Sequence, residues 1–218
     1  MKNYFIPVCT ALLWIASVNL ARADIGLNAK AGTLGAGVEL SKSFSEKFNV
    51  SLGFNAYDLK TTDSSSDIDY DFNFDLQSVA LLGHYHPFSG IFRLTAGALY
   101  NKNELKLTGK PSAGSTYSIN GVSYTAAQVG TLTGTLTFNS TAPYFGLGWG
   151  NRPGGTLGLS ADIGVLYQGS PKLALSATGA LSDPTLAADL ERERQSAESD
   201  LSDFKWYPVV SLGLYYRF

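Results

Sequence analysis

The sequence predicts an all-β protein: an eight-stranded antiparallel transmembrane β-barrel with short periplasmic turns, long extracellular loops and one short helix in the last loop. The first observation is strict alternation in residues 206–218, where Trp206, Leu212 and Phe218 share an apolar face and Ser211 and Arg217 share a mixed one. The second is that no segment after residue 23 approaches about 20 uninterrupted apolar residues, whereas a barrel strand needs only about 9 to 11. The third is that short turns and long polar segments alternate along the chain.

Residues 1–23 have the features of a cleaved signal peptide. Lys2 gives a positive start, residues 4–18 are largely apolar, and small residues, Ala21 and Ala23, flank the end. We therefore expect the outer-membrane barrel to comprise residues 24–218. The single cysteine, Cys9, lies in the predicted signal, which excludes a disulfide scaffold. The remaining chain has 14 basic and 18 acidic side chains, a net charge of −4, and this argues against nucleic acid as a partner.

The first three strands follow one another closely. Segments 25–31 and 36–44 are expected as strands one and two, joined by a glycine-containing turn. After a tight turn at 45–47, residues 48–59 alternate apolar and polar side chains and predict strand three. The polar segment 60–68 then predicts the first long extracellular loop.

Strand four, residues 69–85, carries an acidic face. Four apolar side chains point one way (Tyr70, Phe72, Phe74 and Leu76), and Asp69, Asp71 and Asp75 point the other. Because carboxylates are not tolerated in a dry core, we interpret the acidic face as the lining of a wet lumen. His84 and His86 precede the turn at 87–90 and are interpreted as interfacial residues, with a weak metal site as the alternative.

Strands five to seven follow, separated by one long loop and one turn. Residues 92–107 predict strand five with Arg93 inward, and the long loop 108–130 contains Asn120-Gly121, which predicts a type I′ hairpin over 117–124. Strand six, 131–150, changes its apolar phase between Leu136 and Phe145, so we expect a bulge near 140–143. A turn at 151–155 leads to strand seven, 157–168, with Asp162 inward.

The last loop, 169–205, contains the one expected helix. Asp183 is a suitable N-cap, Pro184 suits the first helical position, and 187–201 is rich in helix formers. From Asp183 to Asp203, seven acids accompany two arginines, a surplus of −5. We interpret this acidic cluster as a solvated face, with a lid that gathers basic amino acids as the alternative. Its central members are Asp189, Glu191, Glu193, Glu198 and Asp200.

Four segments, in this order over most of the chain, resemble the CarO-type family of small outer-membrane porins. They are 117–124, A-P-Y-F-G-L-G at 142–148, G-S-P-K-L-A-L at 169–175, and K-W-Y-P-V-V at 205–210. The layout is also similar to that of OmpW-type barrels. The resemblance implies an eight-stranded barrel linked to uptake of ornithine and other basic amino acids and to carbapenem susceptibility. The aromatic last residue resembles the terminal signal that the barrel-assembly machinery reads.

These features predict a protein of the bacterial outer membrane, surrounded by lipid and lipopolysaccharide. The favoured function is a narrow porin or slow channel for small cationic solutes such as ornithine. The candidate substrate-path residues are Asp69, Asp71, Asp75, Arg93, Asp162 and Arg217. For Arg93, Asp162 and Arg217 we expect a salt-bridged plug, because an eight-stranded barrel is wide enough only for its own side chains or one small ligand, and a selectivity constriction is the alternative.

Two other functions compete with the channel. One is a non-transporting structural or surface-interaction barrel that serves adhesion or partner binding. The other is an enzyme that modifies outer-leaflet lipids, which is disfavoured because the histidines lie far from the loop end and no nucleophile set or phosphate loop is present. We therefore expect no enzymatic activity, no metal and no cofactor.

Overall fold

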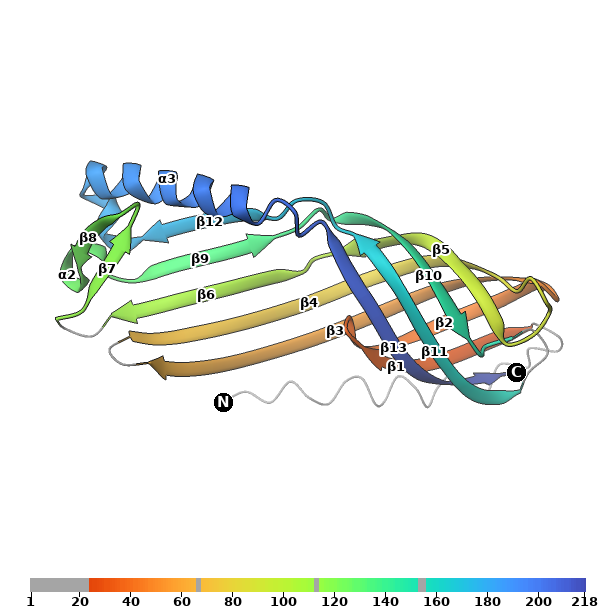
Figure 1. Cartoon of the computed structure of the whole chain (residues 1–218). Coiled ribbons are helices and arrows are strands. Elements are labelled where there is room, and N and C mark those ends of the chain that lie inside the picture. Colours follow the sequence, from red (N-terminus) through yellow and green to blue (C-terminus); the bar gives the residue numbers. More distant parts are fainter. Residues whose placement is uncertain (1–23, 66–67, 112–113, 153–155) are drawn as a thin grey trace.

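The structure, a computed structural model, describes residues 24–65, 68–111, 114–152 and 156–218 (Figure 1). The predicted signal peptide at 1–23 and the end of the predicted turn at 151–155 lie outside the described residues. None of the described helices is long and apolar enough to cross a membrane.

Eight staves, each one strand or two strands in line, form a closed antiparallel barrel. The first four are β1 (Ile25–Gly32), β2 (Gly35–Ser45), β3 (Phe48–Ser65) and β4 (Ile68–Tyr85). The others are β5 (Phe92–Asn101) with β6 (Glu104–Pro111), β9 (Leu132–Thr137) with β10 (Thr141–Trp149), β11 (Leu157–Tyr167) with β12 (Lys172–Ala177), and β13 (Trp206–Arg217). β1 pairs with β13 from Gly26 opposite Arg217 to Gly32 opposite Ser211, which closes the barrel and confirms the predicted fold class.

The loops contain a hairpin and three helical segments. Strands β7 (Thr116–Ile119) and β8 (Val122–Thr125) form the predicted hairpin, with Asn120 and Gly121 at φ 52° and 75°, as a type I′ turn requires. The predicted helix is α3 (Pro184–Asp200), and Asp183 caps it by accepting hydrogen bonds from the Thr185 and Leu186 amides. It has 17 residues and begins at Pro184, as predicted. The short α2 (Ala126–Val129) and the 3₁₀ turn η2 (Thr178–Leu181) were not predicted.

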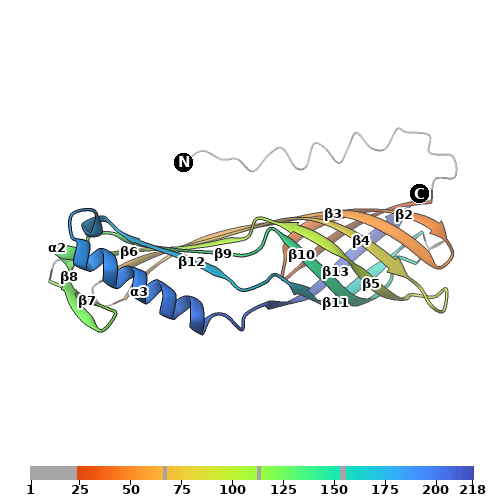
Figure 2. The same cartoon turned by 90° about the horizontal axis from the view of Figure 1, so that it is seen from above.

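Five staves continue past the barrel and form a curved, open sheet (Figures 1 and 2). We call this part the extracellular half-barrel; it consists of residues 57–65 of β3 and 68–77 of β4, together with β6, β9 and β12. The prediction of a loop at 60–68 was therefore wrong, because β3 and β4 stay paired in one register from Phe48 opposite Tyr85 to Ser65 opposite Ile68. The consecutive polar residues 60–65 continue the strand rather than end it.

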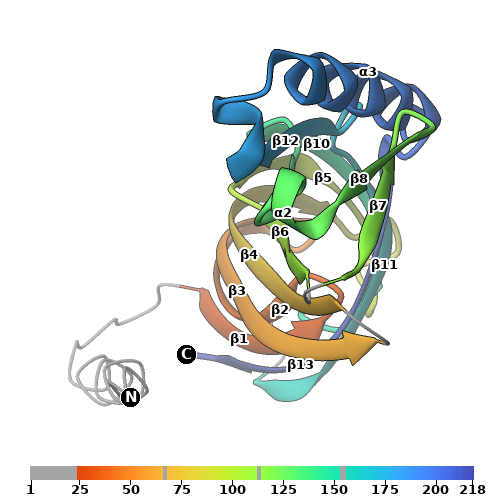
Figure 3. The same ribbon diagram turned by 90° about the vertical axis from the view of Figure 1, so that its left-hand side faces the viewer.

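The opposite side of the barrel is shorter. β2 pairs with β3 only as far as Ala36 opposite Ala56, and β13 begins at Trp206. Seen from its outer end, the half-barrel curves round one side, with α3 at the top and the β7–β8 hairpin at the centre right of the view (Figure 3). The mouth of the barrel is therefore walled on one side and open above β13, β1 and β2.

The outer surface of the barrel is an apolar belt. Side chains such as Leu52, Leu81 and Leu212 are 55%, 60% and 68% exposed. Aromatic side chains gather near both rims: Phe44, Phe48, Tyr85, Trp149, Tyr216 and Phe218 near the short turns, and Tyr100, Tyr167 and Trp206 near the other rim. With the closed fold, this belt places the barrel in the bacterial outer membrane, with the short turns and both ends of residues 24–218 on the periplasmic side.

The predicted bulge near 140–143 was wrong in its position. The pairing of β9 and β10 with the neighbouring stave keeps one register, since Thr137 lies opposite Glu104 and Ala142 lies opposite Leu99, five residues further on both strands. Even-numbered residues therefore face inward on both sides of the break. The phase changes on the next stave instead, at Gly169 (φ 72°), where buried Leu166 and half-buried Leu173 both face inward.

Candidate functional site

An ion pair fills the middle of the lumen. Arg93 on β5 and Asp162 on β11 both point inward, and Arg93 Nη2 donates to Asp162 Oδ1 at 2.6 Å. Arg93 Nη1 also donates to the Gly150 carbonyl at 2.6 Å, and Ser211 Oγ donates to Asp162 Oδ2 at 3.4 Å. Gly148 lies between the two charged residues in the register, where a Cβ atom would stand 2.5 Å from Asp162 Oδ1. The glycine thus leaves the space that the ion pair occupies.

Arg217 closes the periplasmic end of the lumen. Its guanidinium donates to Asp24 Oδ1 at 3.2 Å, to the Asn151 side-chain oxygen at 3.0 Å and to the Ser43 hydroxyl. Asn151 is fully buried and adopts a positive φ of 50°, so the turn that carries it is folded into the barrel end. Three of the predicted path residues thus lie inside the barrel, but Arg217 holds a separate set of partners from Arg93 and Asp162.

The two histidines are lumen residues, and their interpretation as interfacial residues was wrong. His84 is 1% exposed and its ring nitrogens lie 2.8 Å from Ser51 Oγ and 2.9 Å from Thr95 Oγ1. His86 is buried and its Nδ1 lies 2.9 Å from the Gly90 carbonyl oxygen. The inward positions of β4 are even-numbered, so both rings follow the same face as Ser78. The described ring nitrogens thus lie beside hydroxyl, carbonyl and amide groups of the lumen.

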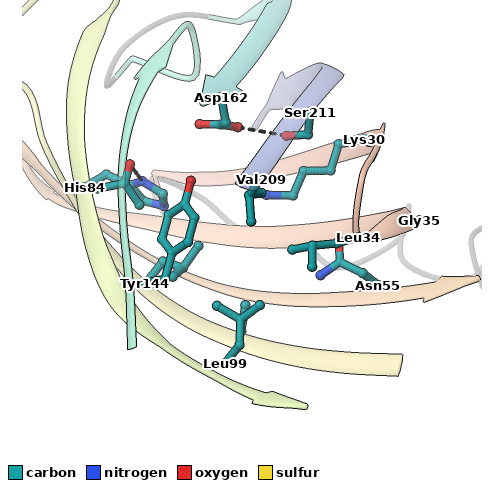
Figure 4. Close-up of a pocket in the computed structure, with 14 residues that line it drawn as sticks. Lys30, Leu34, Gly35, Asn55, His84, Leu99, Tyr144, Asp162, Val209 and Ser211 are labelled. Atoms are coloured by element: carbon teal, nitrogen blue, oxygen red, sulfur yellow. Dashed lines mark hydrogen bonds between the residues drawn. The ribbon is translucent and has the colours of Figure 1, made fainter. Parts of the chain in front are cut away.

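A second ion pair lies toward the mouth of the lumen. Lys30 on β1 donates to Glu39 on β2, and the Glu39 side chain is fully buried. Below the mouth a cavity of about 30 Å³ is bordered by Lys30, His84, Asp162, Leu99 and Tyr144 (Figure 4). A cavity of that size holds one or a few water molecules. The described side chains therefore fill the lumen as a salt-bridged plug.

Asp71 and Asp75 of β4 lie on the outer surface, so their placement in the lumen was wrong. Ser78, Ala80, Leu82 and His84 are the buried side chains of β4, whereas Val79 and Leu81 face outward. Because the register with β3 is unbroken, Asp71 and Asp75 share the outward face of Val79. Asp71 accepts from Thr62 at 2.9 Å and from Lys110 at 3.2 Å, and these contacts lower its pKa. The side chain of Asp69 lies outside the described residues.

The acidic cluster on α3 fastens the hairpin. Asp189 is 4% exposed and accepts from Tyr124 Oη at 2.6 Å, from Asn120 Nδ2 at 3.0 Å and from Arg192 at 2.8 Å. The Tyr124 bond lowers the pKa of Asp189, and the same bond raises the pKa of Tyr124 to about 12. Glu193 accepts from the Asn120 amide at 2.8 Å. These acids are therefore structural partners of the β7–β8 hairpin.

The other acids of the cluster differ in their surroundings. Glu198 accepts from the Leu173 amide at 2.8 Å, which ties α3 to the free edge of β12, and it also pairs with Arg194. Glu191 pairs with Arg194 along the helix, and the hydrogen bonds from this arginine lower its pKa to about 2. Asp200 is exposed at the end of the helix. The cluster is thus partly a structural lock and partly a solvated face.

The inner face of the half-barrel is apolar, which the sequence analysis missed. Its side chains include Tyr57 and Leu59 of β3, Phe74 and Leu76 of β4, and Leu105 and Leu107 of β6. Tyr57, Leu59 and Leu107 are 45%, 42% and 38% exposed. The alternation on strand four signalled this face, but the apolar side was assigned to lipid.

Three polar residues of the lumen were also missed. They were detectable as polar side chains at inward positions of alternating strands: Lys30, Glu39 and His84.

No group of three or more possible metal-ligating side chains occurs among the described residues. No protein-family profile matches the chain, and no curated protein sequence matches it.

Two solved structures of Acinetobacter baumannii proteins are similar to this chain. CarO is 24% identical over 89% of this chain and 98% of its own, with a TM-score of 0.60. CarO2 is 24% identical over 90% of this chain and 99% of its own, with a TM-score of 0.61. These likenesses show that the chain has the fold of an eight-stranded outer-membrane barrel, in agreement with the fold that the resemblance implied.

Proposed function

We propose that the protein is a closed outer-membrane barrel that presents its extracellular half-barrel for binding and does not conduct solutes. The observation that carries this proposal is the packed lumen, in which Arg93 is paired with Asp162, Arg217 is bonded to Asn151, and a cavity of about 30 Å³ lies beside Asp162. An eight-stranded barrel has little interior beyond its own side chains, so this packing agrees with its size. The function is therefore that of a surface-interaction barrel.

A narrow channel for small cationic solutes such as ornithine is the competing proposal. It depended on acids that lead into the lumen, but Asp71 and Asp75 face outward and Asp189 is bonded to Tyr124 and Asn120. These placements support the closed barrel over the channel. Contact of the apolar belt with lipid and lipopolysaccharide, and insertion by the barrel-assembly machinery, form part of the same proposal.

Conductance in planar bilayers tests the closed lumen. The refolded protein, checked by the gel-mobility shift of a folded barrel, is expected to give no current steps and no response to ornithine, while a large general porin provides the positive control. Liposomes that contain the protein should take up labelled ornithine no faster than protein-free liposomes. Reproducible current steps, or saturable ornithine uptake, would overturn the proposal in favour of the channel.

A further inference from the structure

We propose that the uncovered inner face of the extracellular half-barrel binds a cationic amphipathic helix, supplied by a peptide or protein outside the cell. This inference rests on the proposed surface-interaction function and names its ligand class. The face lies above the membrane belt, where its exposed leucine and tyrosine side chains meet water. An apolar surface of this kind, bordered by polar residues, is typical of an interaction site.

The uncovered part of the face spans three neighbouring strands. On β3 and β6, Leu59 and Leu107 are 42% and 38% exposed, and on β4 between them Phe74 and Leu76 are partly exposed. Cross-strand pairing joins these side chains into one surface, since Leu59 lies opposite Phe74 and Phe74 lies opposite Leu105. The face is therefore a continuous apolar strip that runs along the strands.

The rest of the same face already holds a helix. Leu186 and Leu190 of α3 pack in one cluster with Ala177 of β12, and Leu175 and Leu132 pack against that cluster. α3 runs along β12 in both views of the molecule (Figures 1 and 2). Its contacts are with β12, η2 and β7, so it covers the β12 end of the sheet. The chain's own packing thus places a helix along the β12 edge of this face.

The dimensions of the uncovered strip suit a second helix. Three strands about 4.8 Å apart give a width of roughly 14 Å, against a diameter of about 10 to 12 Å for a helix with side chains. The ten residues 68–77 of β4 extend over roughly 33 Å at about 3.3 Å per residue. A helix of about 18 residues, roughly 27 Å long, fits within that length.

Charge selects a basic helix. The half-barrel with its loops, residues 57–77, 102–138 and 168–205, carries 14 acidic and 8 basic side chains, a net charge of −6. Asp200 and Asp203 are exposed at the end of the α3 segment, and Asp58 is exposed on the outer face of β3, the edge strand beside the strip. A partner with lysines beside its apolar stripe gains attraction from this field at physiological ionic strength. An acidic or neutral helix gains none.

A peptide-binding experiment tests this inference. The probe is a synthetic helix of about 18 leucine and lysine residues, roughly 27 Å long, with leucines at i, i+3, i+4 and i+7 and a fluorophore at one end. The protein is held in amphipol, because detergent chains would occupy the apolar strip. We expect saturable one-to-one binding by fluorescence anisotropy. A scrambled peptide of the same composition, without the stripe, should bind at least tenfold more weakly.

Two neighbouring residues of β6 provide a matched pair of variants. Leu107→Asn places an amide on the inner face and should weaken binding about tenfold or more, whereas Thr108→Asn alters the outer face and should leave the affinity unchanged. The inference would be overturned by equal binding of the scrambled peptide or by equal affinity of the two variants for the striped peptide. It would also be overturned if the protein bound lauric acid, as a model of a single lipid chain, but not the peptide. Bilayer current steps would instead remove the proposed closed barrel, whatever the peptide does.

Discussion

The barrel and the extracellular half-barrel are made from the same strands, but their polar and apolar faces are exchanged. On β3 the inward residues change from Asn49, Ser51 and Asn55 in the barrel to Tyr57 and Leu59 above it. The outward residues change in the opposite sense, from Leu52 and Phe54 to Asp58 and Lys60. The surrounding medium explains the exchange, because the barrel wall meets lipid and the half-barrel wall meets water.

The charges divide along the same line. The barrel part, residues 24–56, 78–101, 139–167 and 206–218, has 4 acidic and 6 basic side chains, against 14 and 8 in the half-barrel and its loops. In the barrel, Asp162 and Glu39 are paired inside the lumen, whereas in the half-barrel Asp71 pairs on the outer surface. The outer face of a single strand therefore meets lipid in the barrel and water in the half-barrel, without any change of register.

The largest expected effect comes from breaking the ion pair of the barrel. Arg93→Ala leaves the Asp162 carboxylate buried without its partner, which should lower the free energy of unfolding by about 3 to 5 kcal/mol. Urea unfolding of the refolded protein in lipid measures this free energy. The double variant Arg93→Met with Asp162→Leu removes both charges, so its free energy of unfolding should fall much less. A single variant as stable as the wild type would show that the plug does not depend on this pair.

A smaller and local effect is expected in the extracellular part. Tyr124→Phe keeps the ring but removes its hydrogen bond to Asp189, so hydrogen exchange of residues 116–125 should become faster while the barrel amides stay unchanged. Because the pKa of Asp189 is lowered, its bonds should persist at neutral pH and be lost only when the pH falls below about 4. Ser123→Ala, which alters an exposed neighbour on the same hairpin, is the control. Faster exchange throughout the barrel would contradict the separation of the two regions.

The smallest effect is expected from the acids of β4. Asp71→Asn together with Asp75→Asn changes the outer surface of the half-barrel, so ornithine uptake by liposomes and the unfolding transition should both remain as in the wild type. Reduced uptake in this double variant would return these acids to a solute path.

Much of the barrel was predictable because alternation and turn chemistry are local. The eight staves, the Asn120-Gly121 hairpin and the Asp183 cap of α3 all followed from short segments, and so did the inward Arg93, Asp162 and Arg217. The half-barrel was not predictable in this way, because the pattern of 69–77 is the same whether its apolar side meets lipid or the inside of the sheet. Only the unbroken pairing of β4 with β3 shows that the apolar side chains of this segment face the inside of the sheet.

The same ambiguity produced the misplaced bulge. Leu136 faces inward on β9, and Phe145 faces outward on β10 of the same stave. The apolar side chains change from the inner face to the outer face between the two strands. In the sequence this change looks like a bulge, although the register is continuous. The role of Asp189 was hidden for another reason, since its partners Tyr124 and Asn120 lie 65 and 69 residues away.

The exchange of faces is tested most directly by nitroxide labels placed one at a time along β4. The only cysteine of the sequence is Cys9, so each introduced cysteine between residues 24 and 218 is unique there. Labels at 79 and 81 should be accessible to oxygen dissolved in lipid, and labels at 73 and 75, on the same face, should be accessible to a water-soluble nickel reagent instead. Lipid accessibility along this whole face, from 73 to 81, would contradict the account.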